Sequence, residues 1–339
     1  MNNRQQQVQV NSSLSTEKQV IKCGVPQGSI LGPLLFLIFI NDLPLAIGNT
    51  IHSIDLYADD TTIYDMQYEQ GVLESNLNSS ISSLELWCSN NGMKINMDKT
   101  KVMLITSNQK RRRLVSDALS VKYKNYVLLN SSSEKLLGVF IQNDLKWDLH
   151  VKYISKKISS YLWLLSRIKD FLPLQYRVLF YKAYIQPHVD YCSVMWGNTT
   201  CKNMHKMIKL QRRACKIILG KEYVNLETSF EILKLESFNN RVKYNQAVFM
   251  YKVANNDLPN YICNMYTKNE SEDTNYSLRS LAHLNFKIPM PHSEAFKTGL
   301  LYSGSVLWNN LPAELKLSAS LDTFKTKYLN YIHNPSYTE

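Results

Sequence analysis

The most constraining stretch of the chain is a short, mostly apolar run, residues 54–58, that ends in two adjacent acids, Asp59 and Asp60. Alternate residues over 51–58 give one mixed face and one mostly apolar face, which is the pattern of a half-buried strand. Residues 61–64 predict a second strand. The two segments therefore predict a β-hairpin that carries both acids at or near its tip.

Two ionised carboxylates about 4 Å apart repel by roughly 4 kcal/mol at an effective dielectric near 20. A fold can keep such a pair if water solvates both groups or if a cation sits between the oxygens. Mg²⁺ is the natural occupant when phosphates are the other ligands. The alternative is an ordinary solvated turn, because aspartate is a common turn residue. The two acids alone leave both interpretations open.

Composition narrows the class of protein. The chain has 339 residues, enough for one to three domains, and its net charge of +11 indicates a polyanionic partner, either nucleic acid or a membrane surface. Residues 1–22 contain no signal-peptide core, and the apolar run 30–40 is too short to span a bilayer. Six scattered cysteines predict reduced, mostly buried thiols inside a cell. Cys201 and His205 have helical spacing, but without a second pair burial is favoured over zinc binding.

A glycine-flanked loop precedes the hairpin in the sequence. Gly28 permits a turn, Ser29 is a plausible N-cap, and Pro33 lies in the first turn of an apolar helix that ends before Pro44. Because this helix is apolar nearly all round, we expect it to be buried. The loop allows backbone N–H groups and Gln27 to approach a phosphate or a base closely. The alternative is an ordinary loop that caps a core helix.

After the acidic hairpin, the sequence pattern predicts one long helix, then strands up to about residue 141, and then helices. Apolar spacing predicts a helix over 69–91 that ends at Gly92, followed by a turn over 93–101. Strands are expected over 102–106, 121–129 and 136–141, with Gly138 marking a close backbone approach. From Trp147 onward the pattern is helical, with a break at Pro173. Helices are expected over 154–168, 175–185, 203–219 and 321–332.

The helix over 203–219 carries an uncompensated basic face. No acidic residue occurs between Asn198 and Lys221. Unopposed charge of one sign costs self-repulsion, so a nucleic-acid backbone explains it better than solubility does. The basic residues on this and the preceding long helix that we expect to contact nucleic acid are Lys152, Lys156, Lys206, Lys209, Arg212, Arg213 and Lys216.

Taken together, these segments resemble the reverse transcriptases of non-LTR, LINE-type retrotransposons of the jockey-like kind. The resemblance covers nearly the whole chain in the family's order, so the ordered set is specific although each motif is weak. Its motifs are the runs 24–36, 41–43, Tyr57 to Asp60, Lys94 to Thr100, 137–141 and 145–147, with His150, Tyr191, Trp196-Gly197, Gln211 to Arg213, 307–312 and Phe324-Lys325.

The resemblance implies an α+β fold: a partial right-hand polymerase palm, built as an antiparallel sheet with helices, then an α-helical thumb and a mostly helical C-terminal region. The implied domains are 1–146 (palm), 147–225 (thumb) and 226–339 (element-specific region). The implied activity is that of an RNA-directed DNA polymerase. Its implied partners are an RNA template, a DNA primer or target, and deoxynucleoside triphosphates, with no membrane. The compartment is intracellular, either nucleus or cytoplasm.

The resemblance also assigns roles to residues. Asp59 and Asp60 would be catalytic metal ligands for two Mg²⁺ ions, with Mn²⁺ possible, and Lys99 would lie near the leaving pyrophosphate. In such chemistry one ion activates the primer 3′-hydroxyl and the other holds the triphosphate. The residues expected to bind the incoming nucleotide, the template base or the primer end are Pro26, Gln27, Gly28, Tyr57, Leu137 and Gly138.

The sequence departs from the family pattern in one respect that bears on activity. Family members carry another catalytic aspartate on a palm strand before the glycine-rich segment, and the fingers precede that strand. This sequence begins after both, so we expect an N-terminally truncated chain that is inactive alone; neither Asp42 nor Asp55 is well placed as a substitute. An alternative is a non-catalytic RNA- or DNA-binding relic that uses only the basic helices. A group II intron or telomerase-type polymerase shares the palm motifs but not the later sequence context.

Overall fold

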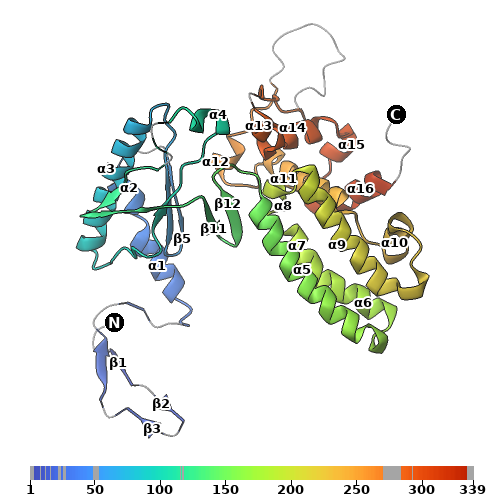
Figure 1. Cartoon of the computed structure of the whole chain (residues 1–339), viewed down its shortest axis with the longest axis horizontal. Helices are drawn as coiled ribbons and strands as arrows, with labels where there is room; N and C mark the ends of the chain where they lie inside the picture. The colour runs from blue at the N-terminus through green and yellow to red at the C-terminus, as the bar shows by residue number, and fades with distance from the viewer. Residues whose placement is uncertain are drawn as a thin grey trace. The chain divides into compact units, whose positions relative to one another are not determined.

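The structure is a computed structural model, and it describes residues 4–333 except 8, 12, 16, 22–23, 26–27, 49–52, 115, 117, 270–283 and 292. The chain divides into two compact units, Met1–Ser132 and Ser133–Glu339, called here the first and second unit. Each is described by itself (Figure 1). The fold is mixed α and β, as predicted. Among the described residues, no helix is both long enough and apolar enough to cross a bilayer.

Paired short strands and a long helix make up the first unit. Its antiparallel pairs are β1 (Arg4–Gln6) with β4 (Gln19–Ile21), β2 (Gln9–Val10) with β3 (Ser13–Leu14), β5 (Ser53–Tyr57) with β6 (Asp60–Tyr64), and β8 (Lys122–Tyr123) with β9 (Tyr126–Val127). β7 (Lys101–Val102) pairs in parallel with β10 (Leu129–Asn130). The described strands thus form two-stranded sheets, and the single antiparallel sheet that we expected is not formed by them. The helices are α1 (Gly32–Ile40), α2 (Leu43–Ile47), α3 (Gln70–Asn90) and α4 (Asn108–Arg111).

The core of the first unit forms where α3 covers the hairpin and α2. Apolar positions on one face of α3, among them Ile81 and Leu84, are buried together with Ile47. The predicted helix over 69–91 is therefore confirmed to within a residue, and Gly92 follows it with a left-handed φ of 68°. The helix is stabilised mainly because its apolar face packs against the rest of the core.

Helix α1 is not buried as the sequence suggested. Leu34, Leu37 and Ile38 are 54%, 57% and 66% exposed, and only Gly32 and Ile40 within the helix are buried. Only one side of α1 packs against the core of the first unit, so apolar residues on its other sides are exposed. Composition showed that the helix is apolar all round, but burial depends on how many sides neighbouring elements cover.

The second unit opens with a hairpin, β11 (Ser133–Leu136) and β12 (Val139–Gln142), and continues as helices. The strand expected over 136–141 is confirmed over 139–141, but its start is wrong, because Leu137 and Gly138 form the turn. The helices are α5 (Asp148–Ile168), α6 (Leu174–Phe180), α7 (Gln186–Asp190), α8 (Ser193–Trp196), α9 (Cys201–Leu219), α10 (Leu226–Leu233), α11 (Phe238–Ala254), α12 (Asn260–Cys263), α13 (Glu294–Thr298), α14 (Leu300–Asn309), α15 (Ala313–Lys316) and α16 (Leu321–His333). A π-helical turn, Tyr181–Ile185, joins α6 to α7, and 3₁₀ turns cover Lys169–Phe171 and Gly220–Glu222.

Two clusters of buried side chains hold the second unit together. One lies where α5 and α9 run side by side and includes Ile158, Leu162, Ala214 and Ile218 (Figure 1). It extends as far as Val242 of α11. The other joins α11 to α14, α15 and α16. The first cluster thus spans 151–242, whereas the predicted boundary between thumb and C-terminal region at 225 stays a prediction.

The cysteines match the prediction in part. Each described cysteine is a free thiol. Cys88 and Cys215 are buried, Cys192 and Cys263 are half-buried, and Cys201 is exposed, whereas Cys23 lies outside the described residues. The expectation that Cys201 is buried is wrong, because it occupies the first turn of α9 on the side away from the core.

Candidate active site and nucleic-acid interface

The predicted acidic hairpin is confirmed. Tyr57 pairs with Asp60, so Ala58 and Asp59 are the two-residue loop and Asp60 begins β6. Two-residue hairpin loops favour a left-handed first residue, and Ala58 has φ of 52°. A side chain other than glycine in that region costs of order 1 kcal/mol. The turn therefore holds the two acids next to each other in a tight and locally strained loop.

The hairpin is anchored by one face only. Ile54, Leu56 and Ile63 pack against the core under α3. Tyr57 is 66% exposed, and Ala58, Asp59 and Asp60 are exposed as well. The apolar alternation thus fixes the strands to the first unit while the tip extends into solvent. This places both carboxylates where a metal ion and a phosphate can reach them.

No cation of the described residues neutralises this pair. Neither Asp59 nor Asp60 forms an ion pair with a lysine or arginine that the structure describes. Nor does the described part of the chain contain a group of three or more acids, histidines and cysteines able to hold a metal. Two carboxylates suit Mg²⁺ that takes its remaining ligands from water and substrate phosphates. They are too few for an all-protein calcium cage.

The other residues predicted around the nucleotide are placed less completely. Pro26 and Gln27 lie outside the described residues. Gly28 has φ of 80° and open space where a Cβ would lie, so its backbone conformation, not crowding, requires glycine. Lys99 is exposed in a turn, where its backbone N–H donates to the Asn96 carbonyl oxygen at 3.2 Å. Asp42 accepts a hydrogen bond from Trp87 Nε1 at 3.0 Å, which is a structural role.

Leu137 and Gly138 lie in the second unit, at the turn of the β11–β12 hairpin. Both are left-handed, with φ of 44° and 88°, as a tight hairpin turn requires. The Tyr191 hydroxyl donates to the Leu137 carbonyl oxygen at 2.6 Å. A Cβ on Gly138 would lie 3.3 Å from Tyr191 Cε1, so the predicted close approach at Gly138 is confirmed, and its partner is a side chain.

The basic helix of the prediction is α9. The Thr200 side chain caps it by accepting from the Asn203 backbone N–H, and Met207 and Ala214 are buried against the core. Its outer face is cationic, and within the described residues none of these side chains has a carboxylate partner. The exposed cations of α9 are Lys202, Lys206, Lys209, Arg212, Arg213 and Lys216, and those of α5 that were predicted to bind nucleic acid are Lys152 and Lys156.

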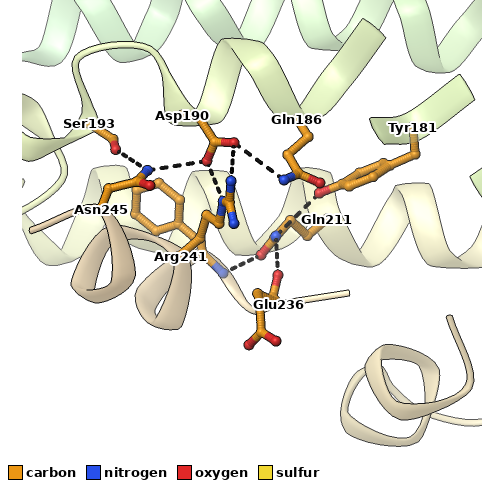
Figure 2. Close-up of polar contacts among 9 residues, drawn as sticks. Tyr181, Gln186, Asp190, Ser193, Gln211, Glu236, Arg241 and Asn245 are labelled. Carbon is orange, nitrogen blue, oxygen red and sulfur yellow. Dashed lines mark hydrogen bonds and ion pairs between the residues drawn. The ribbon is translucent and has the colours of Figure 1, made fainter. Parts of the chain in front are cut away.

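A polar network that sequence reasoning missed fixes the helices behind this face (Figure 2). Arg241 Nε and Nη2 donate to the two oxygens of Asp190 at 2.6 and 2.8 Å. Gln186 and Asn245 also donate to Asp190, at 3.3 Å each. The ion-pair partners are 51 residues apart, so no local spacing could have revealed them.

A second set of hydrogen bonds anchors the basic helix through Gln211 of α9. Its Nε2 donates to the Glu236 carbonyl oxygen at 3.1 Å and to the Tyr181 hydroxyl at 3.3 Å, and its Oε1 accepts from the Phe238 N–H at 2.7 Å (Figure 2). Burial raises the pKa of Tyr181 to about 12, so its hydroxyl stays protonated. These bonds hold α9 in register with α11.

Comparison with known proteins connects this geometry to a family. The model of the family described as "Reverse transcriptase (RNA-dependent DNA polymerase)" matches residues 3–154, a segment that contains the acidic hairpin. Residues 3–154 are therefore similar to the reverse transcriptase family. The reverse transcriptase segment thus covers the whole first unit apart from its first two residues and continues into α5.

Curated relatives come from mobile elements. The chain is 27% identical over 234 residues to the probable RNA-directed DNA polymerase from transposon BS of Drosophila melanogaster, covering 66% of this chain and 25% of that protein. It is 24% identical over 209 residues to the RNA-directed DNA polymerase from mobile element jockey of the same organism, covering 59% of this chain and 22% of that protein. The chain therefore matches about a quarter of the length of these relatives. The resemblance to non-LTR retrotransposon polymerases is confirmed by these matches.

Proposed function

We propose that this chain supplies the metal-binding hairpin and part of the nucleic-acid grip of an RNA-directed DNA polymerase. The observation that carries the proposal is the exposed Asp59–Asp60 pair at a strained hairpin tip, inside the segment that matches the reverse transcriptase family. The proposed partners are an RNA template, a DNA primer or target and deoxynucleoside triphosphates. The net charge of +11 supports the nucleic-acid part of the proposal.

In the proposed mechanism, Asp59 and Asp60 hold divalent metal, Mg²⁺ or Mn²⁺. When bound, the metal ions supply charge neutralisation at the triphosphate and activation of the primer hydroxyl. The chain's own contribution is then positioning, since phosphoryl transfer leaves little covalent work to the protein. Lys99 is proposed to contact the leaving pyrophosphate, the loop over 26–28 and Tyr57 to contact the nucleotide, and Leu137 and Gly138 to contact the primer end.

The metal proposal predicts a loss of binding in Asp59→Asn. Removing one of two carboxylate ligands is expected to weaken Mn²⁺ binding at least tenfold when a deoxynucleoside triphosphate is present, because charge and a ligand oxygen leave together. Electron paramagnetic resonance of free Mn²⁺ measures the change. Asp55→Asn is the matched control, because it removes the same charge from β5 of the same hairpin. Equal affinities for the two variants would contradict the proposal.

The basic face of α9 predicts salt-dependent nucleic-acid binding. For single strands, the slope of log affinity against log salt is about −0.7 per neutralised phosphate. Lys206→Glu with Arg213→Glu is expected to make that slope shallower and to lower the affinity. Lys297→Glu with Lys325→Glu changes the charge equally, but each of those lysines already pairs with a carboxylate, so this control is expected to bind nearly normally. Salt-insensitive binding would contradict the role of α9.

The two tests together separate the proposal from its alternative. A chain that binds nucleic acid through α9 but shows no difference between Asp59→Asn and Asp55→Asn would be a non-catalytic nucleic-acid-binding protein. The observation that favours this alternative is the uncompensated positive charge of α9. The expectation that the isolated chain does not extend a primer stays a prediction.

A further inference from the structure

A small cavity in the second unit lies outside the basic faces described above. It is bounded by the β11–β12 hairpin, α5 and the α7–α8 segment, and its volume is about 240 Å³. Pockets that hold whole small-molecule ligands are typically about 300–1,000 Å³. The cavity therefore fits a single group, such as a phosphate, better than an entire nucleotide.

Two lysines converge on one tyrosine in the wall of this cavity. Lys135 Nζ lies 3.3 Å from the Tyr153 hydroxyl and 5.0 Å from the centre of its ring. Lys157 Nζ lies 4.9 Å from the centre of the same ring. Among the described residues neither lysine forms an ion pair with a carboxylate, and no residue that lines the cavity is acidic. Two cations on the same aromatic ring, with no acid in the lining, make this cavity suitable for an anion.

The pKa values of two titratable residues in the cavity wall are lowered, that of Tyr153 by the lysines and that of His188 mainly by burial. Hydrogen bonds from Lys157 and Lys135 lower the pKa of Tyr153. Burial, and then the charge of Lys157, lower the pKa of His188, which lines the same cavity. Both shifts have the sign that a cationic environment produces. The lysines are exposed, so an incoming anion does not have to displace protein groups to reach them.

The inner wall of the cavity is formed by neutral groups, and no carboxylate there would repel a bound anion. His150 is 2% exposed, and its Nδ1 accepts a hydrogen bond from the Phe140 N–H at 3.3 Å. The proton of the neutral ring is therefore on Nε2, and this buried N–H has no hydrogen-bond partner in the described residues. Gly138 leaves the rim open, because it has no side chain beside Tyr191.

We propose that this cavity binds a backbone phosphate of a nucleic-acid strand, with Lys135 and Lys157 as its cationic ligands and Tyr153 holding both ammonium groups in place. The proposal rests on the proposed function, because it assumes that the second unit binds nucleic acid. It adds a phosphate contact beside the turn of the β11–β12 hairpin, apart from the α9 residues. Lysine suits this role because it binds phosphate as a compact point charge.

The test measures affinity for a labelled single-stranded oligonucleotide by fluorescence anisotropy over a range of salt concentrations. Lys135→Gln with Lys157→Gln is expected to weaken binding about tenfold and to reduce the magnitude of the salt slope by about 0.7, the value of one phosphate. Lys135→Arg with Lys157→Arg should retain most of the affinity. Lys297→Gln with Lys325→Gln is the matched control and should bind as the unaltered chain does.

The outcomes distinguish this proposal from the broader one. If the glutamine pair binds normally while Lys206→Glu with Arg213→Glu binds weakly, the cavity assignment is wrong and the nucleic-acid function stands. If the unaltered chain fails to bind the oligonucleotide, both are wrong. Binding of inorganic phosphate to the cavity, detected by ³¹P resonance broadening, with oligonucleotide affinity unchanged in the glutamine pair, would also overturn the assignment to a nucleic-acid strand.

Discussion

Replacing Arg241 with methionine is expected to lower the free energy of unfolding of the second unit by about 3–5 kcal/mol. Arg241 makes two hydrogen bonds to Asp190, and the side chains are 23% and 24% exposed. The variant would leave a carboxylate largely buried with only two amide donors, those of Gln186 and Asn245. Native-state hydrogen exchange of α9 and α11 amides measures the loss in the unit concerned.

Two comparisons show whether the loss comes from the stranded charge. Asp190→Leu with Arg241→Met should cost less than the sum of the two single changes, because no unpaired charge remains. Lys297→Met breaks a pair of similar length, 2.7 Å, whose Glu294 side chain is 87% exposed. Its cost should be far smaller than that of Arg241→Met, since exposed pairs contribute little. A loss as small as this in Arg241→Met would show that the network does not hold the helices together.

Lowering the pH from 7.5 to 5 is expected to reduce the free energy of unfolding by about 2 kcal/mol through His150 alone. Burial lowers the pKa of His150 from 6.5 to about 4, so the folded chain keeps the ring neutral while the unfolded chain protonates it. Stability that is fully present above pH 6.5 is therefore lost as the pH falls toward 4. Urea unfolding followed by tryptophan fluorescence measures the change, and Trp196 lies against His150, with 5.2 Å between ring centres.

The contribution of His150 is isolated by a variant that cannot titrate. In His150→Gln, an amide oxygen can still accept from the Phe140 N–H, so the fold should persist at pH 7.5. The drop in stability between pH 7.5 and 5 should then be smaller by about 2 kcal/mol than in the unaltered chain. His188, whose pKa is also lowered, titrates in both proteins, so its contribution cancels in the difference. The same drop in both would show that His150 is solvated.

Local sequence patterns were sufficient to predict elements whose backbone hydrogen bonds join residues that are close in the sequence. The alternation before Asp59 predicted the β5–β6 hairpin, and apolar spacing predicted α3 and α9 to within two residues and α5 without its first six residues. These patterns are reliable because a helix or a tight hairpin needs only its own backbone and one apolar face. The same reasoning found the cationic side of α9, since charge at helical spacing lies on one face.

Tertiary structure decided what lies next to these elements. The exposure of α1 depends on how many of its sides other elements cover, and Leu137-Gly138 became a turn because β11 and β12 pair on either side of it. The Asp190–Arg241 pair and the cavity beside Tyr153 each join residues distant in sequence. Their positions are set by the packing of whole helices, which no local pattern records. The sequence by itself determined which residues are acidic, basic or apolar and on which face they lie; the packing determined which of them meet.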